Sequence, residues 1–552
     1  MAAALAASIV IAAVVLASPA WAATYTVNTN ADSGEGSLRQ AIIDANTTTG
    51  VADTINFDPS LSGQTITLTS GQLPTIESQF DVAGLTIDGG SAEITISGAN
   101  QYGVFEVDPG ANLTLRNLTE KGGISNHGGT LTVSNSTISG IYNQSGTATV
   151  SNSTVSSKEL GDFLGIYNLG ALTVSNSTIS GNSAGGINNN ASGTLEVSNS
   201  TISSNGTSAS FGAGGGIFNS GSTATVSNST ISGNGNSVSG SDGGGIYNHS
   251  TLTVSNSTIS GNSAEEGGGI LSDFGTVTVG NSTISDNSAA FGGGINNKVT
   301  FPAASATFKN TIVAANHASA VVPDVRGSFT SQGHNLIGQS DCSVEFCFTN
   351  EDLVGTTANP IDPMLGPLAN NGGPTLTHAL LEGSPAIDKG VAVEGITTDQ
   401  RGFARPQGTA PDIGSFESEF TTTGDTIKPH VSTATPTGTG ISRDTNLRAT
   451  FSEQMDPTSI TKSTFKLFRC PSATSTNCTT QITNGTLRKS TDGLSATINP
   501  YGTSATKLNA KTKYKAVITT GAKDMAGNAL DQDQNPNNGN QPKHWTFTTG
   551  PK

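Results

Sequence analysis

The sequence predicts an all-β chain, in which a right-handed parallel β-helix with about three short strands per turn is followed by a small β-sandwich. Three observations support this prediction. A motif close to LTVSNSTISGN recurs between residues 131 and 316. The sequence contains 68 Gly and many Val, Ile and Thr residues, whereas only 12% of its residues are charged and 5% are aromatic. From Thr426 onward, short alternating strands are separated by turn sequences.

The repeat defines the turns of the β-helix. Its copies start 17 to 29 residues apart, a period typical of solenoids; no repeat carries a helical segment, and a propeller blade would need roughly 40 residues. Within one copy Leu252 and Val254 alternate with hydroxyl residues, while Ile259 and Ile246–Tyr247 supply two further short strands. We expect stacked turns ~4.8 Å apart, joined by backbone hydrogen bonds between identical strands.

An Asn follows the first strand of each repeat at a fixed position. Asn tolerates the left-handed backbone conformation of such a corner, and its side-chain amide can bond to the identical Asn of the next turn. Each of these residues also begins an N-S-T glycosylation sequence, but a structural ladder explains the whole set at once. The predicted ladder consists of Asn135, Asn152, Asn176, Asn199, Asn228, Asn256 and Asn281.

The N-terminus has the pattern of a secretory signal peptide. An apolar run ends in Ala20, Trp21 and Ala22, which predicts cleavage after Ala22. A retained membrane anchor is the alternative, since the run is just long enough to span a bilayer. No later stretch is apolar enough to do so, and we therefore expect a secreted or cell-surface protein with no membrane span in the mature chain.

Charge and cysteine content restrict the partners. The net charge of −16 and the scarcity of Lys argue against nucleic-acid binding. Two close cysteine pairs predict two local disulfides in a secreted chain, Cys342–Cys347 and Cys470–Cys478. No His accompanies either pair, so we expect no metal site and no cofactor. A loop in an acidic β domain explains the one group of candidate Ca²⁺ ligands equally well: Asp524, Asn528, Asp531 and Asp533.

The segment before the repeats predicts a cap for the open first turn. Ser37 can N-cap a short helix that carries Leu38, Ala41 and Ile42 on one face. A helix at this place would cover the exposed end of the solenoid, as a solenoid end requires.

Several segments resemble known families. The repeat is similar to secreted bacterial right-handed β-helix proteins, and its GGGIYN phrase resembles the GGA-type repeats of polymorphic outer-membrane proteins. Residues 26–46 are similar to the SLR-containing segment that opens many such proteins. GHNLIG, residues 362–390, DQRGFARPQG and DIGSFE together closely resemble the module called choice-of-anchor Q. FSEQMDPTSI, KDMAGNAL and WTFTTG resemble the bacterial Ig-like domain of S-layer and exported surface proteins.

These patterns divide the chain into six segments. We expect a signal peptide (1–22), an N-terminal cap (23–60), the right-handed parallel β-helix (61–345), a choice-of-anchor Q-like part (346–420), a linker (421–428) and the Ig-like domain (429–550). In the Ig-like domain the alternation places these residues inward: Leu447, Ala449, Phe451, Tyr514, Ala516, Ile518, Trp545 and Phe547.

One row of residues is the candidate ligand-binding surface. Repeat length varies almost entirely before the GGI phrase, and variable loops on one edge are where a solenoid usually binds. The residues after the inward Ile face out beside these loops and suit the apolar faces of sugar rings. Alternatively, they pack under the loops and anchor them. The candidates are Tyr142, Tyr167, Phe218 and Tyr247, in a row with Asn188, Leu271 and Asn296.

Catalysis is not predicted, and no catalytic residue is assigned. β-Helix lyases and glycoside hydrolases need clustered carboxylates, whereas the acids of the repeats do not recur at one register over several turns. His127, His249 and His317 share no repeat position either. The scattered acids are Glu159, Asp162, Glu196, Asp242, Glu265, Glu266, Asp273 and Asp286.

The sequence therefore predicts an exported, adhesin-like, non-enzymatic protein that binds a glycan or a surface protein. A β-helix polysaccharide lyase or glycoside hydrolase is the alternative. A minor alternative is an ice-binding or purely structural envelope protein, because the outward residues of the first strands form a T-x-S array typical of good exposed strand formers. That array comprises Thr132/Ser134, Thr149/Ser151, Thr173/Ser175, Thr225/Ser227 and Thr253/Ser255, interrupted by Glu196.

Overall fold

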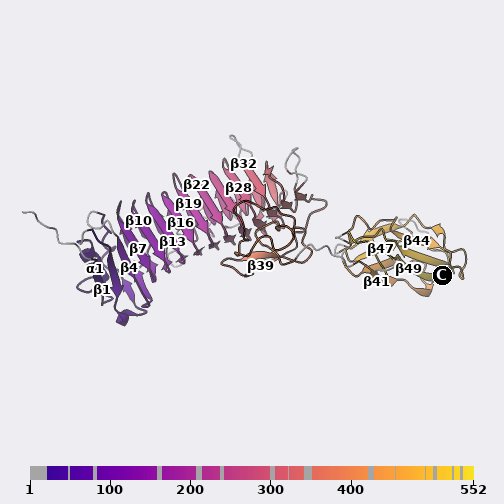
Figure 1. Cartoon of the computed structure of the whole chain (residues 1–552), viewed down its shortest axis with the longest axis horizontal. Helices are drawn as coiled ribbons and strands as arrows, with labels where there is room; N and C mark the ends of the chain where they lie inside the picture. Colours follow the sequence, from indigo (N-terminus) through magenta and orange to yellow (C-terminus); the bar gives the residue numbers. More distant parts are fainter. Residues whose placement is uncertain are drawn as a thin grey trace, which may run out of the picture. The chain divides into compact units, whose positions relative to one another are not determined.

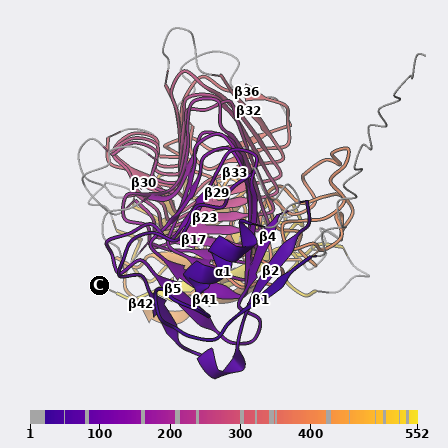
Figure 2. The ribbon, with the colours of Figure 1, turned by 90° about the vertical axis from the view of Figure 1, so that its left-hand side faces the viewer.

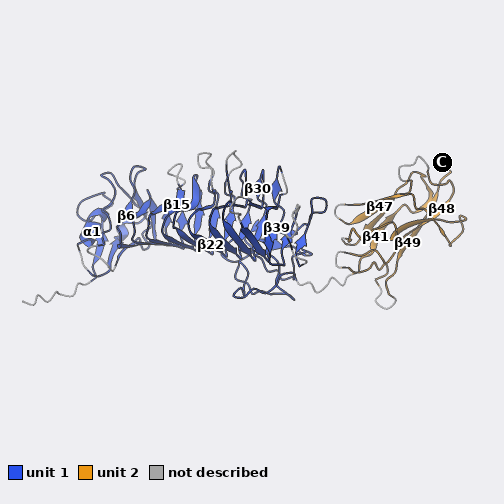
Figure 3. Cartoon of the chain, turned by 90° about the horizontal axis from the view of Figure 1, so that it is seen from above, with its two compact units in different colours: residues 1–421 blue, residues 422–552 orange. Residues whose placement is uncertain are grey.

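A computed structural model shows two compact units, residues 1–421 and residues 422–552 (Figure 3). The signal-peptide residues 1–21 and the linker residues 421–427 lie outside the described residues. The structure describes residues 22–47, 50–78, 84–157, 164–206, 214–235, 241–298, 305–320, 323–340, 348, 351–420, 428–453, 455–490, 493–501, 507–524, 527–534 and 539–551.

Three parallel sheets stack along the first unit (Figure 1), and we name them A, B and C. Sheet A contains β1 (Thr24–Val27), β2 (Asp53–Phe57), β4 (Leu85–Asp88), β7 (Asn112–Arg116), β10 (Thr130–Ser134), β13 (Thr147–Ser151), β16 (Ala171–Ser175), β19 (Thr194–Ser198), β22 (Thr223–Ser227), β25 (Thr251–Ser255), β28 (Thr276–Gly280), β32 (Ser305–Lys309) and β36 (Thr330–Ser331). Sheet B contains β3 (Thr65–Thr67), β5 (Ile94–Ser97), β8 (Leu118–Lys121), β11 (Thr137–Ile138), β14 (Thr154–Val155), β17 (Thr178–Ser180), β20 (Thr201–Ser203), β23 (Thr230–Ser232), β26 (Thr258–Ser260), β29 (Thr283–Ser285), β33 (Ile312–Val313), β37 (Leu336–Ile337) and β38 (Leu353–Val354). Sheet C contains β6 (Phe105–Val107), β9 (Ile124–Asn126), β12 (Ile141–Asn143), β15 (Leu164–Asn168), β18 (Gly185–Asn189), β21 (Ile217–Asn219), β24 (Ile246–Asn248), β27 (Ile270–Ser272), β31 (Ile295–Asn297) and β35 (Val325–Gly327).

The register confirms the predicted parallel β-helix. Each turn places one strand in each sheet, and identical repeat positions pair between turns: Leu131 with Ala148, and Val133 with Val150. The apolar residues of these columns are buried in one continuous core, while the hydroxyl residues between them face out. Because the side-chain period of a strand is two, this register places every Leu, Ile and Val column inside.

The predicted helix caps the first turn. α1 (Leu38–Ala45) begins at Ser37, whose side chain accepts a hydrogen bond from the backbone N–H of Gln40. Its buried face, which includes Leu38 and Ile42, joins the solenoid core, and Figure 2 shows the helix lying across the open end of the stack. Sheet A already begins at β1, within the segment that the sequence assigns to the cap. A short 3₁₀ helix, Pro59–Leu61, follows β2.

The Gly-rich corner before sheet C has a packing cause. Gly243 takes a φ of +63°, which L side chains rarely adopt. At Gly245 a Cβ atom would stand 2.5 Å from the backbone oxygen of Gly269 in the next turn. The corners therefore stack so closely that only Gly fits, and the GGGI phrase repeats for that reason.

Two long side-chain amide ladders lie at registers other than the predicted one, which carries amide bonds at one end only. One follows the ends of the sheet C strands, with Nδ2–Oδ1 distances of 2.7 to 2.8 Å, and consists of Asn126, Asn143, Asn168, Asn189, Asn219 and Asn248. The other lies after the sheet B strands, with distances of 2.9 Å, and consists of Asn182, Asn205, Asn234, Asn262, Asn287 and Asn316. This second ladder ends at the carboxylate of Asp324.

The seven residues of the predicted ladder form the corners instead. All of them take the expected left-handed conformation, with φ between 47° and 52°: Asn135, Asn152, Asn176, Asn199, Asn228, Asn256 and Asn281. The corner points the first of these side chains outward to solvent, whereas the buried Asn rows need amide partners. Side-chain bonds do occur at the covered end of the row, from Asn256 to Asn228 and from Asn310 to Asn281.

After β38 the chain folds back over the outer face of sheet B. This covering segment, residues 361–420, contains the antiparallel pair β39 (Leu365–Ala369) and β40 (Thr377–Leu380) (Figure 1). Gln400 is buried in it; its amide nitrogen donates to Thr230 and its amide oxygen accepts from Thr258. A buried ion pair, Arg405–Glu417 at 2.9 Å, lies behind this contact. A small parallel pair, β30 (Ser288–Ala289) and β34 (His317–Ala318), completes the unit.

The second unit is a β-sandwich with its own core, as the sequence predicts. All eight residues expected inside are buried. The two sheets follow: β41 (Val431–Thr435), β43 (Leu447–Phe451), β47 (Ser495–Asn499) and β46 (Thr486–Lys489); and β42 (Gly438–Ile441), β49 (Lys543–Thr549), β48 (Lys513–Ile518), β44 (Phe465–Arg469) and β45 (Thr480–Gln481).

The structure joins Cys470 to Cys478 in this unit. The other predicted pair, Cys342 and Cys347, lies outside the described residues. Within the described parts of the chain, no helix is long and apolar enough to cross a membrane.

Candidate functional site

The candidate aromatic residues form one straight row on the outer face of sheet C. Each follows a buried Ile, and the register aligns them turn by turn. Since neighbouring turns are ~4.8 Å apart, the row runs along the solenoid axis. In order, its members are Ser125, Tyr142, Tyr167, Asn188, Phe218, Tyr247, Leu271, Asn296 and Arg326.

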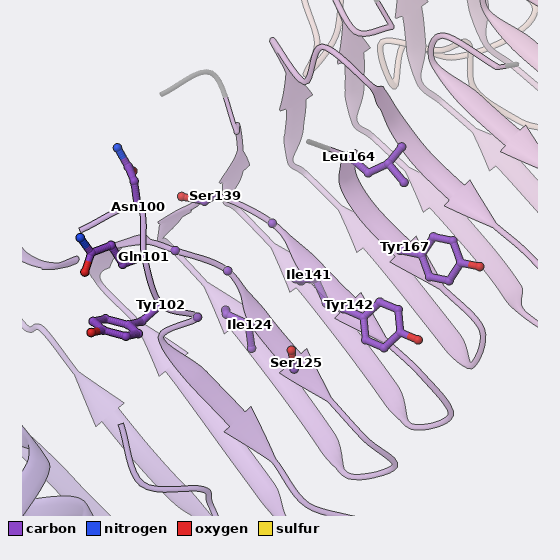
Figure 4. Close-up of a pocket in the computed structure, with 14 residues that line it drawn as sticks. Asn100, Gln101, Tyr102, Ile124, Ser125, Ser139, Ile141, Tyr142, Leu164 and Tyr167 are labelled. Atoms are coloured by element: carbon purple, nitrogen blue, oxygen red, sulfur yellow. The ribbon is translucent and has the colours of Figure 1, made fainter. Parts of the chain in front are cut away.

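The first part of the row lines a pocket of about 630 Å³. Tyr142 and Tyr167 project from adjacent strands with their rings stacked, at a centroid distance of 5.4 Å and an angle of 12° (Figure 4). Tyr142 is 39% exposed, and Tyr102 contributes a third ring. Stacked rings that remain open to solvent offer a flat apolar platform.

Polar groups lie beside this platform. Asn100, Gln101, Ser125 and Ser139 line the same pocket, together with backbone at several glycines. None of the residues that line the pocket is Asp, Glu, Lys, Arg or His. An apolar platform with a few amide and hydroxyl groups, and no charged group, suits an uncharged polyhydroxy ligand.

Glu120 lies directly beneath the pocket, and the sequence did not single it out. It occupies the inward position that Ile96 holds one turn earlier. Its carboxyl accepts hydrogen bonds from the backbone N–H groups of Gly123 and Ser139, at 2.6 and 3.2 Å. Burial raises the pKa of Glu120 to about 7, and the two hydrogen bonds oppose that rise. The signal is present in the sequence: TEK stands where other turns have a T-I pair.

Phe218 and Tyr247, the second aromatic pair of the row, form an aromatic cluster of four rings with His249 and Phe274, which lie just after sheet C strands. The ring centroid of Tyr247 lies 5.4 Å from that of Phe218 and 4.4 Å from that of His249. The centroids of His249 and Phe274 are 6.3 Å apart. Tyr247 is only 8% exposed, whereas Phe274 is 51% exposed. The four sequence candidates therefore divide into two places, the pocket and this cluster.

Acidic residues gather beside the aromatic cluster, contrary to the expectation that the acids are scattered. The backbone of Asp242 forms a parallel β-bridge with that of Glu266 in the next turn, and Glu266 forms one with Phe291 in the turn after that. Lys298 forms an ion pair with Glu266 at 2.7 Å. Asp242, Glu266 and Phe291 each stand immediately before a GGGI phrase, a register that is visible in the sequence once the phrases are aligned.

The charges of this region perturb one another. Burial raises the pKa of Asp242; Lys298 opposes that rise, and Glu266, Glu265 and Asp273 add to it. Burial lowers the pKa of His249, so the imidazole is neutral near pH 7. Burial also raises the pKa of Tyr247, with further contributions from Asp242, Asp273 and Glu266. Asp242, Glu266 and Asp273 thus act electrostatically on Tyr247, and Asp273 also acts on His249.

Other candidates lie elsewhere. The T-x-S residues form the outer face of sheet A in exact register, with Glu196 between Thr173 and Thr225. In the second unit, Asp531 pairs with Lys428 at 3.2 Å and Asp524 accepts from Asn528 at 2.8 Å. Among the described residues, no group of three or more His, Cys, Asp or Glu is placed to hold a metal ion.

Two family models match the chain. The right-handed β-helix region matches residues 141–351, and the bacterial Ig-like domain matches residues 425–549. A search of curated proteins finds no match.

Solved structures resemble parts of the chain at low identity. Domains 1–6 of the surface layer protein SbsC are 19% identical, with 23% of this chain and 14% of that chain covered and a TM-score of 0.16. Pectate lyase Pel9A is 17% identical, with 72% and 96% covered and a TM-score of 0.35. The mannuronan C-5 epimerase AlgE6 A-module of Azotobacter vinelandii is 12% identical, with 57% and 100% covered and a TM-score of 0.31. These values support no assignment of activity; the chain contains a right-handed β-helix region and a bacterial Ig-like domain.

Proposed function

We propose that this is an exported cell-surface protein that binds a polysaccharide along the outer face of sheet C without cleaving it. The observation that carries the proposal is the stacked, solvent-open pair Tyr142 and Tyr167 in a pocket with amide and hydroxyl groups. Sugar rings present apolar faces to aromatic platforms and hydroxyl edges to amides. Because the row follows the axis, several sugar units of one chain can lie on successive turns.

Three features support the surface location. The signal-peptide pattern of residues 1–22 favours export. The covering segment, residues 361–420, carries the choice-of-anchor Q resemblance, and we propose that it belongs to such a module. The Ig-like domain is a suitable spacer between the β-helix and the cell.

The first experiment is a glycan array probed with the mature chain from Ala23, with release of soluble product assayed in the same wells. Tyr142→Ser is the informative variant, because Ser125 already stands at that register one turn earlier. Loss of one stacking ring is expected to weaken binding roughly tenfold, about 1.4 kcal/mol. Phe420→Ala, an exposed ring outside the row, is the matched control. An unchanged glycan affinity in Tyr142→Ser would contradict the proposal.

Cleavage of the bound chain is the second candidate function. It is favoured by one observation: a backbone β-bridge brings Asp242 and Glu266 to neighbouring turns, and both carboxylates act on Tyr247. Glycoside cleavage uses two carboxyl groups that flank the bond. Product release that is lost in Asp242→Asn and Glu266→Gln would establish it. Binding without any release would leave the non-enzymatic proposal standing.

A further inference from the structure

The aromatic cluster differs from the pocket in its charge. The residues that line the pocket include no acid or base, whereas Asp242, Glu265, Glu266 and Asp273 all act on the cluster or on one another. Lys298 is the cation among them, and Glu266 already neutralises it at 2.7 Å. With His249 neutral near pH 7, the rings stand in a field of excess negative charge.

The rings are arranged so that a ligand can reach them. Phe274 is half exposed, Phe218 and His249 are partly exposed, and the rings meet edge to face or tilted. Ring faces carry negative charge in their quadrupole, so a cation within ~6 Å of a centroid is attracted. Aromatic faces surrounded by carboxylates are the chemistry that recognises an organic ammonium group.

Two polar atoms at the cluster lack partners. Nε2 of His249 and Oδ1 of Asp273 are buried atoms without a hydrogen-bond partner among the described residues. A carboxylate oxygen accepts hydrogen bonds, as does Nε2 of a neutral imidazole whose proton is on Nδ1, and an ammonium group supplies three donors. A buried acceptor left unpaired costs about 1–3 kcal/mol, which a donor from a ligand would recover.

We propose that the aromatic cluster is a second binding site, specific for a protonated amine, and that the bound polysaccharide therefore carries amino sugars. This inference rests on the proposed function and names its substrate class. Asn188 stands between Tyr167 and Phe218 in the row, so two turn spacings separate the pocket from the cluster. One glycan chain lying along the row thus places neutral units over Tyr142 and Tyr167 and an ammonium group over the exposed Phe274, beside His249.

The test compares two probes by isothermal titration calorimetry on the full mature chain. The probes are a deacetylated glucosamine oligosaccharide and its fully N-acetylated counterpart of equal length. The wild-type protein is expected to bind the deacetylated probe at least tenfold more tightly, with a preference that shrinks as salt is added. Asp242→Asn combined with Asp273→Asn is expected to abolish the preference for the deacetylated probe.

The control separates a specific site from the overall acidity of the protein. Glu196→Gln combined with Glu382→Gln removes the same number of charges at two exposed positions and is expected to keep the preference. Equal binding of the two probes, lost in Tyr142→Ser, would overturn the amine site but not the proposed function. Binding of neither probe would overturn the amine site, and the glycan array with Tyr142→Ser decides the proposed function separately. A preference reduced equally by both double variants would show only general attraction to the acidic protein, and would overturn the site.

Discussion

A single carboxyl group inside the apolar core shows what one residue can do to this fold. Glu120 is fully buried, with Ile96 stacked beside it in the preceding turn. Burial raises its pKa from 4.5 to about 7. The folded protein therefore holds the proton more tightly than the unfolded chain, and the resulting stability is present below about pH 4.5 and lost as the pH rises through 7.

Glu120→Gln is expected to remove this pH dependence. Relative to the variant, the wild-type free energy of unfolding should fall by ~3 kcal/mol between pH 4.5 and pH 8, because each tenfold difference in proton affinity between the folded and unfolded chain corresponds to about 1.4 kcal/mol. Urea denaturation of both proteins across this range measures the difference. Parallel pH profiles for the two proteins would refute the buried, neutral carboxyl.

At the scale of the elements, the amide ladders hold successive turns together. Oδ1 of Asn205 accepts from both the backbone N–H and Nδ2 of Asn182, and Nδ2 of Asn205 donates to Asn234 and to the backbone oxygen of Ile179. Asn199, in the same turn, holds a left-handed corner instead, with φ +47°. The two residues have the same chemistry and different structural roles.

This difference predicts unequal costs of substitution. Asn205→Ala leaves several buried groups unpaired and is expected to cost ~3 kcal/mol or more. Asn199→Ala places Ala in the left-handed region and is expected to cost about 1–2 kcal/mol, whereas Asn199→Gly should be close to neutral. Thermal unfolding of the three variants ranks them. A larger loss of stability in Asn199→Ala than in Asn205→Ala would contradict this ranking. It would instead favour an amide ladder at the register that the sequence predicts.

The covering segment depends on a few buried polar contacts with sheet B. Gln400 donates to Thr230, Thr375 and the backbone oxygen of Leu376, and accepts from Thr258.

Gln400→Leu is therefore expected to lower the free energy needed to detach residues 361–420 from sheet B by ~3 kcal/mol, while the solenoid core stays folded. Limited proteolysis should cut this segment faster in the variant, and Gln532→Leu, a similar change in the second unit, should not affect the rate. Equal cleavage rates in wild type and Gln400→Leu would mean that the segment is held by other contacts.

At the scale of the whole molecule, the two units have separate cores. The bond between Cys470 and Cys478 closes a short loop in the second unit only. A disulfide that closes such a loop raises the free energy of unfolding by ~3 kcal/mol or less, mainly because it restricts the unfolded chain.

We expect two calorimetric transitions, of which Cys470→Ala combined with Cys478→Ala lowers only one. That transition belongs to the second unit. Residues 428–552 expressed alone should therefore unfold at the same temperature as this unit does in the wild-type chain. A single transition, or a shift of both, would show that the units unfold together.

The sequence by itself determined the repeating β architecture, the helix that begins at Ser37, and the inward and outward sides of the strands. These depend on local periodicity, capping and turn chemistry, which a short window of residues contains. It also located the row that contains Tyr142 and Tyr167, because a residue after an inward Ile must face out.

Only the tertiary structure decided which Asn rows bond through their amides, which strand faces residues 361–420 cover, and where Asp242 meets Glu266. These are contacts between residues 17 to 170 positions apart, and they depend on how the corners stack and how the chain returns. Glu120 illustrates the reason. Its residue type predicts a charged surface group, but its register places it in the core, and burial then decides its protonation.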